Sequence, residues 1–347
     1  MLVADAKAVA RQWVEEERPS LQNFHGAYLA GSMTCLPDNA SLPDASDIDI
    51  KVILDLPDVL ADPRKLVYSG AILDVSYGPV KDVASPEAIL GSYFTAVHFA
   101  HPSILSDPTG RLSQIQAVVA SDYPKREWVR RRCQHARQTL ETTLTGWDTA
   151  GSMKDAVSGW LFASVFLPPM VLVADLQNPT HRRGMANLLQ VLTRYGHREL
   201  HERVLDAVGI AGMSQGDVER LFAACAEAYD AATTILQTPF MLASNIRSFA
   251  RPIAIGGGQE LIAEGFHREA MVWIAFIHTL CHTAFANDAP EDMRARFAPG
   301  YQHLLTALGV STLDQLAERK QMIGQLIPDL WSVVEEIIDA NPAIRDS

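Results

Sequence analysis

The chain has 347 residues, of which 48% are hydrophobic and 20% charged, a composition typical of globular proteins. Its 41 acidic and 29 basic side chains give a formal net charge of −12. Such a surface repels polyphosphate backbones, which disfavours a dedicated nucleic-acid-binding protein and suits a cationic small-molecule partner. The length indicates two domains or one large one.

The cysteines and the apolar runs bear on location. Four cysteines are scattered without a Cys-x-x-Cys pair, so neither a disulfide framework nor a zinc ribbon is indicated. The N-terminal residues are typical of a charged helix and not of a signal peptide. The longest apolar run, 159–174, is short for a membrane span and contains Pro168 and Pro169. We therefore expect a cytoplasmic protein in which this run is a buried helix with a break.

The first predicted elements are a helix and a strand. Residues 2–18 carry apolar side chains at helical spacing, and Pro19 ends the predicted helix. A short apolar run then stops at Gly31 and Ser32, which is typical of a strand that ends in a tight turn.

Residues 46–54 alternate between charged and apolar side chains, so Asp47, Asp49 and Lys51 share one face of a predicted strand. Two carboxylates this close can hold the same ion, and carboxylates on a rigid strand suit Mg²⁺. The Gly31-Ser32 turn offers backbone N–H groups and a hydroxyl to phosphate oxygens. Together they predict a site for a metal-bound nucleoside triphosphate. The alternative for an isolated Asp-x-Asp is a solvated strand face.

Gly31-Ser32, a loop and Ser46-Asp47-Ile48-Asp49 resemble the signature of the nucleotidyltransferase superfamily, which includes DNA polymerase beta and the antibiotic adenylyltransferases. The resemblance implies a third carboxylate on a later strand, and Asp74 supplies one within the apolar run 71–77. The loop 33–46 departs from the pattern, because it is slightly long and lacks the glycine and arginine that often follow the Gly-Ser pair. The metal site is therefore the part that the residues match most closely.

The next segment is mostly connections. Residues 57–65 are polar and carry prolines, which predicts a connection or a short helix. Ser85 and Pro86 predict the N-cap and first position of a helix. Residues 102–110 predict a short strand and a turn, in which Asp107 is either functional or an ordinary turn residue.

Strand patterns end near Tyr123, and helical periods follow to the end of the sequence. The expected helices span residues 126–147, 153–176, 182–194, 197–208, 214–237, 259–286, 311–323 and 328–339. The expected breakers between them are Pro179, Gly209, Pro239, Gly256-Gly257-Gly258, Pro290 and Pro299-Gly300. We therefore expect an α/β (α+β) nucleotidyltransferase domain with a small mixed sheet at residues 1–122, followed by an all-α helical bundle at residues 123–347.

The helix start Met153-Lys154-Asp155-Ala156 resembles that of streptomycin and spectinomycin adenylyltransferases, in which the helical domain presents a lysine to the triphosphate. The resemblance assigns this role to Lys154. A lysine there would add positive charge where phosphate charge develops. The alternative is a solvent-facing lysine at a helix start.

Residues 256–269 form the densest polar cluster of the second half. A triple glycine before a helix could let the backbone approach a ligand, and Glu264, His267 and Arg268 fall about one turn apart. Glu269 beside them could contact the acceptor or serve as the base, as helical-domain carboxylates do in several antibiotic nucleotidyltransferases. The alternative is a flexible loop followed by a helix with surface charges.

Two smaller features have ordinary alternatives. Arg182 and Arg183, at a predicted helix N-terminus, suit phosphate or carboxylate binding but are equally typical of a solvated surface. His278 and His282 have the i, i+4 spacing of zinc ligands. Without a neighbouring glutamate or a fourth ligand, they are expected to be core histidines.

The resemblance implies attack of an acceptor hydroxyl on the α-phosphate of a nucleotide, with pyrophosphate as the leaving group. Two Mg²⁺ ions would bind at Asp47, Asp49 and Asp74, and Asp74 would also accept the hydroxyl proton. Gly31 and Ser32 would hold the β- and γ-phosphates. Because the layout most resembles aminoglycoside-type adenylyltransferases, we expect transfer of AMP from ATP to a small, cationic hydroxyl compound.

Other functions remain open on the sequence alone. One is modification of a macromolecule, by protein AMPylation or by tRNA modification as in toxin–antitoxin nucleotidyltransferases, although no basic stripe supports tRNA binding. The other is a non-catalytic nucleotide sensor, against which the complete set of carboxylates argues. The sequence fixes neither the acceptor nor the oligomeric state.

Overall fold

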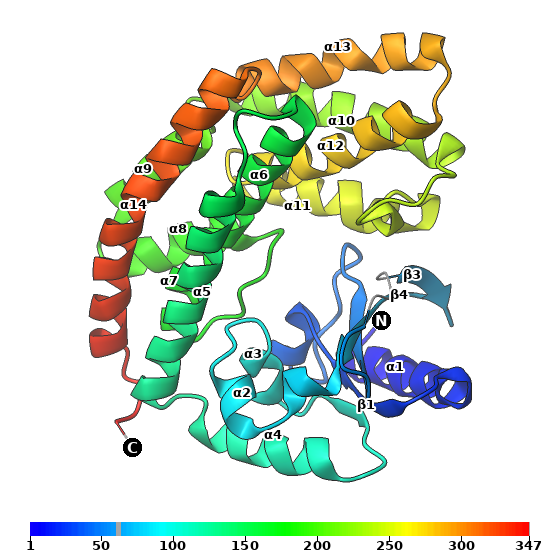
Figure 1. Cartoon of the computed structure of the whole chain (residues 1–347), viewed down its shortest axis with the longest axis vertical. Helices are drawn as coiled ribbons and strands as arrows, with labels where there is room; N and C mark the ends of the chain where they lie inside the picture. The colour runs from blue at the N-terminus through cyan, green and yellow to red at the C-terminus, as the bar shows by residue number, and fades with distance from the viewer. Residues whose placement is uncertain (60–63, 347) are drawn as a thin grey trace. The chain divides into compact units, whose positions relative to one another are not determined.

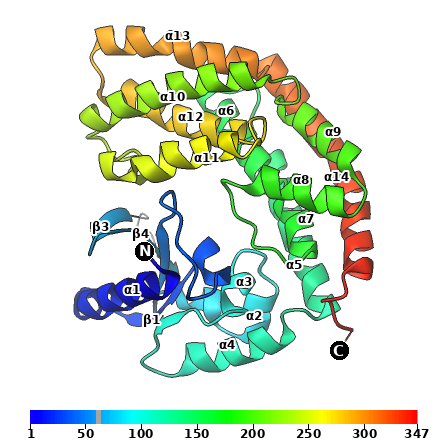
Figure 2. The same ribbon diagram turned by 180° about the vertical axis from the view of Figure 1, so that it is seen from behind.

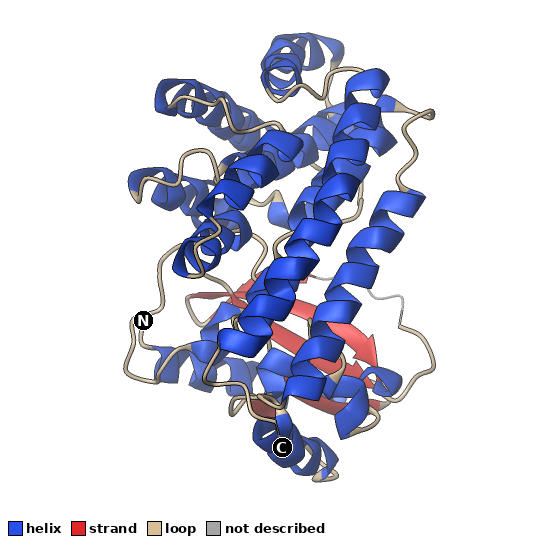
Figure 3. Ribbon diagram, turned by 90° about the vertical axis from the view of Figure 1, so that its left-hand side faces the viewer, coloured by secondary structure: helices blue, strands red, loops and turns tan. Residues whose placement is uncertain are grey.

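The computed structural model describes residues 1–59 and 64–346, which form two compact units. The first unit comprises Met1–Arg132, the short segment Leu176–Asn178 and the described residues from Pro342 on. The second unit comprises Cys133–Asp175 and Pro179–Asn341. The strands of the described residues all belong to the first unit, and the second consists of helices and their connections (Figures 1 and 3).

The first unit contains the expected segment 1–122 and continues into the helix α5 (Arg126–Gly146). Arg132 accounts for this extension, because its buried guanidinium donates to the carbonyl oxygens of Tyr123 at 2.7 Å and Leu90 at 3.3 Å. A buried charge requires such partners, so they fix the start of α5 to the first unit. The boundary between the units therefore falls after Arg132, whereas the change in composition placed it at residue 123.

A five-stranded mixed sheet forms the centre of the first unit. Its strands are β1 (Phe24–Leu29), β2 (Ile48–Leu54), β3 (Arg64–Tyr68), β4 (Ala71–Pro79) and β5 (Ile104–Ser106). Their order is β3-β4-β2-β1-β5, with β2 and β4 parallel and the other neighbours antiparallel. The helices of this unit that pack on the sheet are α1 (Val3–Glu17), α2 (Pro86–Leu90), α3 (Ala96–Phe99) and α4 (Arg111–Asp122). The small mixed sheet followed by helices is the predicted class of architecture.

Helices cover both faces of this sheet (Figure 1). The face that carries Ile48 and Ile50 is buried against α1. On the opposite face, Tyr28 and Ile53 pack into a core formed with α2, α3 and α4. Asp49 points to this second face as well, because it is separated from Ile53 by an even number of residues. It stays half-buried at the end of the strand, so the covering helices leave a polar end of the face accessible.

Part of the prediction for residues 57–65 is wrong. Arg64 and Lys65 begin the strand β3, which pairs with β4 through a two-residue turn. The connection predicted over residues 60–63 lies outside the described residues. Polar residues at the start of this segment hid the strand, because the apolar run that marks it begins only at Leu66.

The second unit is a set of helices, with α14 packed along α6, α7 and α9 (Figure 2). Its helices beyond α5 are α6 (Met153–Phe166), α7 (Pro169–Ala174), α8 (Gly184–Arg194), α9 (Arg198–Val208), α10 (Gln215–Ile235), α11 (Gly257–Ala263), α12 (Met271–Asp288), α13 (Glu291–Ala307) and α14 (Leu313–Ala340). A short π-helix, Pro252–Gly256, leads into α11. The predicted end of a helix at Gly209 is confirmed, since Gly209 takes a left-handed conformation (φ 93°) directly after α9.

Two prolines lie inside helices, although Pro299 was predicted to separate helices and Pro328 to begin one. Pro299 lies inside α13, a helix absent from the predicted set, and Pro328 lies inside α14, which joins the predicted helices 311–323 and 328–339 into one. A proline inside a helix costs ~3 kcal/mol. Buried apolar residues continue on both sides of Pro328, so the burial of this helix face offsets that cost.

The glycines of the second unit also differ from the prediction. Gly257 and Gly258 are buried within α11, so they do not form a flexible loop. The predicted helix 259–286 is interrupted instead at Gly265, which is left-handed with φ 89°. Phe266 N–H donates to the carbonyl of Leu261 at 2.8 Å, which is the hydrogen bond of a Schellman C-cap.

The apolar run is a core segment, as expected. Among the described residues, Met153–Ala174 is the one helical stretch long and apolar enough to cross a membrane, and 72% of its most apolar window is buried inside the protein. It is divided into α6 and α7 at Leu167 and Pro168, so the predicted break is confirmed.

Candidate metal and nucleotide site

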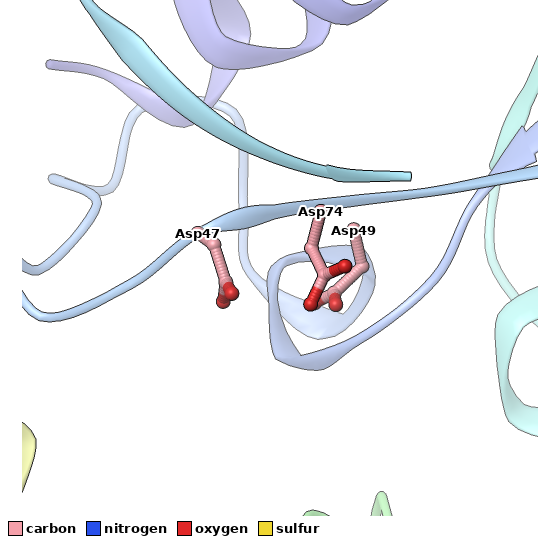
Figure 4. Close-up of side chains that lie close together, drawn as sticks. All are labelled: Asp47, Asp49 and Asp74. Atoms are coloured by element: carbon pink, nitrogen blue, oxygen red, sulfur yellow. The ribbon is translucent and has the colours of Figure 1, made fainter. Parts of the chain in front are cut away.

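Three neighbouring strands place charged residues side by side at the polar end of the sheet face. Asp49 of β2 pairs with Asp74 of β4, and Asp74 pairs with Lys65 of β3. Because directly opposite residues on neighbouring strands point to the same face, these three side chains form a row across the sheet. Asp47 precedes β2 by one residue and points the same way (Figure 4).

The carboxylates of Asp47, Asp49 and Asp74 are placed to bind a metal ion. One oxygen from each lies within 4.8 Å of the other two, and all three residues are half-buried. Carboxylate oxygens that leave room for water and phosphate ligands are the donor set that suits Mg²⁺ and Mn²⁺. The residues present therefore fit a divalent ion. No other group of three His, Cys, Asp or Glu side chains in the described part of the chain brings its ligand atoms this close.

Lys65 is the member of the site that the sequence analysis missed. Its ammonium forms ion pairs with Asp47 and with Asp74, the latter at 2.5 Å between Nζ and Oδ2. The Lys65 side chain is only 3% exposed, whereas those of Asp47 and Asp74 are 18% and 25% exposed. Lys65 therefore bridges two of the predicted metal ligands from below the surface.

The pKa values at this end of the sheet reflect these contacts. Burial alone would lower the pKa of Lys65, but the negative charges of Asp47 and Asp74 outweigh burial and raise it, so Lys65 is an ammonium ion. Burial raises the pKa of Asp74, and the charge of Asp47 adds to this effect while Lys65 opposes it. The carboxylates thus repel each other and gain from any cation placed between them.

A hairpin signal in the sequence could have located Lys65. Ser69 and Gly70 both have positive φ, 48° and 78°, and form the two-residue turn between β3 and β4. A Ser-Gly pair between two apolar runs is typical of such a hairpin. The residues that flank the turn pair with each other, so counting back along both strands places Lys65 opposite Asp74.

Gly31 lies directly against the carboxylate of Asp49. Its backbone has φ 69° and ψ −168°, a region that only glycine adopts without strain. A Cβ atom at this position would lie 1.8 Å from Oδ2 of Asp49. The backbone N–H of Ala30 also donates to the carbonyl of Asp49 at 2.9 Å. The absence of a side chain at Gly31 is therefore required by the position of Asp49.

Two side chains hold the turn through the carbonyl oxygen of Gly31. Thr34 Oγ1 donates to it at 2.8 Å, and Asn178 Nδ2 donates to it at 2.9 Å. Asn178 belongs to the short segment Leu176–Asn178 of the first unit. Ser32, the other residue predicted to contact phosphate, is exposed at the start of the 3₁₀ turn Ser32–Cys35. The turn thus has a fixed backbone and an accessible hydroxyl.

The remaining predicted site residues lie in the second unit. Lys154 occupies the first turn of α6, where its side chain is exposed. Glu269 is buried, 4% exposed, and its Oε1 lies 3.7 Å from Nε2 of His201. Burial raises the pKa of Glu269 and lowers that of His201 to about 4. The roles assigned to Lys154 and Glu269 remain predictions.

The charged cluster near Glu269 is held by ion pairs inside the second unit. Arg183 contacts Glu264 with both terminal nitrogens, one of them 3.0 Å from Oε1. Arg268 binds Glu202 with two hydrogen bonds of 2.7 and 2.9 Å. Because each guanidinium binds a carboxylate of the same unit, Arg183 and Arg268 have a structural role in these ion pairs.

The glycines next to this cluster have a packing role. A Cβ on Gly257 would lie 2.6 Å from Cδ of Arg182, and one on Gly258 would lie 3.2 Å from the ring of Phe222. These two glycines therefore allow neighbouring side chains to pack closely on α11. Side chains of the protein itself occupy the space in which the sequence analysis expected a ligand to approach the backbone.

His278 and His282 are packing residues, as expected. His282 stacks on the ring of Tyr301 with centroids 4.2 Å apart, and His278 lies 5.4 Å from the same ring. His278 is 2% exposed, and burial lowers its pKa to about 4. Both histidines therefore pack against Tyr301 between α12 and α13, where His278 is buried and His282 is half-buried.

No protein-family model matches the chain, and no curated protein matches it. Its function is therefore inferred from its residues and their geometry.

Proposed function

We propose that the protein is a Mg²⁺-dependent nucleotidyltransferase that transfers AMP from ATP to a hydroxyl group of a small, cationic molecule. The observation that carries the proposal is the contact between the Gly31 turn and the carboxylate row, which consists of Asp47, Asp49 and Asp74. Asp49 and Asp74 are paired on neighbouring strands, and Asp49 contacts Gly31, where only a glycine fits. A metal held by these carboxylates would lie next to the turn that is expected to hold phosphate.

The proposed transfer exchanges one phosphorus–oxygen bond for another. The acceptor oxygen bonds to the α-phosphorus, the bond from that phosphorus to the bridging oxygen breaks, and pyrophosphate leaves. A bound divalent ion would polarise the phosphate and lower the pKa of the hydroxyl. Asp47 and Asp49 would hold the ion, and Asp74 would accept the hydroxyl proton.

The Gly31 turn would bind the β- and γ-phosphates. The left-handed backbone of Gly31 lets phosphate oxygens approach without meeting a Cβ atom, and the exposed hydroxyl of Ser32 can donate to them. The hydrogen bonds from Thr34 and Asn178 to the carbonyl of Gly31 keep the turn in this conformation. By the resemblance, Lys154 would add a positive charge for the triphosphate.

The choice of substrates rests on charge and on resemblance. A net charge of −12 favours a cationic acceptor over a polyanion. ATP and the adenylyl group follow from the resemblance to aminoglycoside-type adenylyltransferases. The four cysteines are thiols outside any disulfide of the described residues, which is compatible with the proposed location in a reducing cytoplasm.

The proposal is tested by pyrophosphate release from ATP, GTP, CTP and UTP in the presence of Mg²⁺, with a panel of aminoglycosides and amino-alcohols as acceptors. Release that depends on one acceptor supports it. Nucleotide binding without release for any small acceptor contradicts the small-molecule assignment and favours a macromolecular target or a sensing role. Failure to bind any nucleotide contradicts the nucleotidyltransferase assignment itself.

A further inference from the structure

A buried lysine occupies a cation position between two of the predicted metal ligands. Lys65 is 97% removed from solvent in its side chain, and its ammonium contacts both Asp47 and Asp74. Removing an ammonium ion from water is costly unless opposite charges and hydrogen bonds compensate it. The two carboxylates provide that compensation, so their ion pairs fix the ammonium of Lys65 between Asp47 and Asp74.

The backbone also holds Lys65 in place. β3 is joined to β4 by the two-residue turn at Ser69 and Gly70, and five consecutive residues of β3 pair with β4. Lys65 is directly opposite Asp74 in this register. Its stem therefore emerges beside Asp74, and the ammonium reaches Asp47 without leaving the sheet face.

The order of residues across the sheet separates two ends of the site. Lys65 on β3, Asp74 on β4 and Asp49 on β2 follow one another in register, and Gly31 lies beyond Asp49 at the end of β1. The phosphate-binding turn is thus at one end of the row and the lysine at the other. A divalent ion that contacts phosphates would lie at the Asp49 side of the row, next to Gly31.

The charges of the three carboxylates and of Lys65 favour the binding of a single divalent ion. The ammonium of Lys65 already pairs with Asp47 and Asp74, which are two of the three carboxylates of the site. A second divalent ion would have to enter beside the ammonium, and like charges that close repel each other strongly.

We propose that Lys65 is a built-in cation that takes the place of one of the two metal ions expected at this site, so that each chain binds a single divalent ion. The inference rests on the proposed function, and it differs from the two-ion site that the resemblance implies. The ammonium holds Asp47 and Asp74 together at the end of the row where the acceptor hydroxyl would enter. The divalent ion serves the end next to Gly31.

The proposal predicts how many Mn²⁺ ions the protein binds, which electron paramagnetic resonance of free Mn²⁺ measures in a titration without nucleotide. The wild-type chain is expected to bind one ion. Lys65→Met removes the ammonium but keeps most of the stem, and it is expected to bind two. Lys65→Arg restores the charge and is expected to return the number to one.

Lys51 provides a matched control. It lies on β2, points to the same face as Asp49 and donates from Nζ to the carbonyl of Tyr77 at 2.8 Å. Lys51→Met removes a half-buried lysine from the same sheet without touching the carboxylates, and it is expected to leave the number of ions at one. Far-UV circular dichroism of each variant verifies that the sheet is retained.

Each outcome of the titration either supports or overturns the proposal for Lys65. Two ions on the wild-type chain, or one ion on a folded Lys65→Met, overturns the proposal for Lys65 while leaving the metal site in place. If Lys65→Met does not fold, the wild-type number alone decides, with one supporting the proposal and two overturning it. If neither the wild type nor any variant binds Mn²⁺, both this inference and the proposed function are overturned. If the wild type binds Mn²⁺ and Asp49→Asn does not, the metal site of the proposed function is supported, whatever the number of ions on Lys65→Met.

Discussion

Gly31 and Asp49 are in such close contact that no side chain fits between them, since a Cβ atom on Gly31 would lie 1.8 Å from Oδ2 of Asp49. The turn that is proposed to hold phosphate and the carboxylate that is proposed to hold the metal therefore depend on each other. A change at either residue should disturb both functions of the site.

The variant Gly31→Ala should lower stability and divalent-ion binding together. The backbone conformation of Gly31 costs another residue ~1–3 kcal/mol, and the new methyl group would displace the Asp49 carboxylate. Urea unfolding and Mn²⁺ titration measure the two effects. Gly212→Ala is the control, because a Cβ there meets no atom within 4 Å and no strained φ is required. Retention of wild-type ion affinity in Gly31→Ala would contradict the coupling.

Asn178→Ala should loosen the phosphate-binding turn. The variant removes one of two hydrogen bonds to the carbonyl of Gly31, and a hydrogen bond of this kind contributes ~0.5–1.5 kcal/mol. We expect a loss of stability in this range and weaker ATP binding, measured by urea unfolding and calorimetry. Thr34→Val removes the other donor and should have a similar effect. Unchanged ATP affinity in both variants would show that the turn does not bind phosphate.

His278→Phe should reduce the loss of stability in acid. Burial lowers the pKa of His278 to about 4, below the unfolded value near 6.5, so the unfolded state binds more protons between these values. Stability from this group is present above pH 6.5 and is lost as the pH falls towards 4. The wild type should lose about 2 kcal/mol more than His278→Phe between pH 7 and pH 5.

Urea unfolding at the two pH values checks this prediction. Phenylalanine keeps the ring that packs on Tyr301 and introduces no group that titrates. Equal losses for wild type and variant would mean that His278 is protonated in the folded state at pH 5.

Asp74→Asn and Glu269→Gln distinguish two candidates for the catalytic base. Asp74 belongs to the carboxylate row, whereas Glu269 is buried beside His201 in the second unit. Loss of a general base typically lowers turnover by ~10²–10⁴-fold. We expect a loss of this size for Asp74→Asn and none for Glu269→Gln, measured as the turnover number at saturating ATP and acceptor. The reverse result would assign the base to Glu269.

The sequence pattern predicts the strand that carries Asp49 well, because alternating apolar and charged residues determine which face each side chain points to. With Ile48 and Ile50 buried against α1, Asp49 has to point to the opposite face, and the parallel partner strand brings Asp74 beside it. The parallel pairing itself could not be derived from local pattern. Residues 48 and 73 are brought into register by the fold as a whole, through strands that are separated in the sequence.

Lys65 was missed because its segment begins with polar residues and its importance comes from a partner on another strand. Pro299 and Pro328 misled the helix prediction for a different reason. Local chemistry disfavours proline inside a helix, but the burial of the helix faces around it compensates. Gly265 shows the opposite case, in which an unremarked glycine ends a helix because a left-handed residue is needed there. Tertiary packing, which no short window contains, decides such positions.

The most direct test of the proposed function compares Mg²⁺-dependent pyrophosphate release by wild type, Asp49→Asn and Asp44→Asn, with the mass of the acceptor measured before and after reaction. Asp44 is an exposed carboxylate of the preceding loop that lies outside the carboxylate row, which makes it a matched control. We expect wild type and Asp44→Asn to release pyrophosphate and to add one AMP unit to the acceptor, and Asp49→Asn to do neither. Near-normal transfer by a folded Asp49→Asn would contradict the assignment of the carboxylate row as the catalytic metal site.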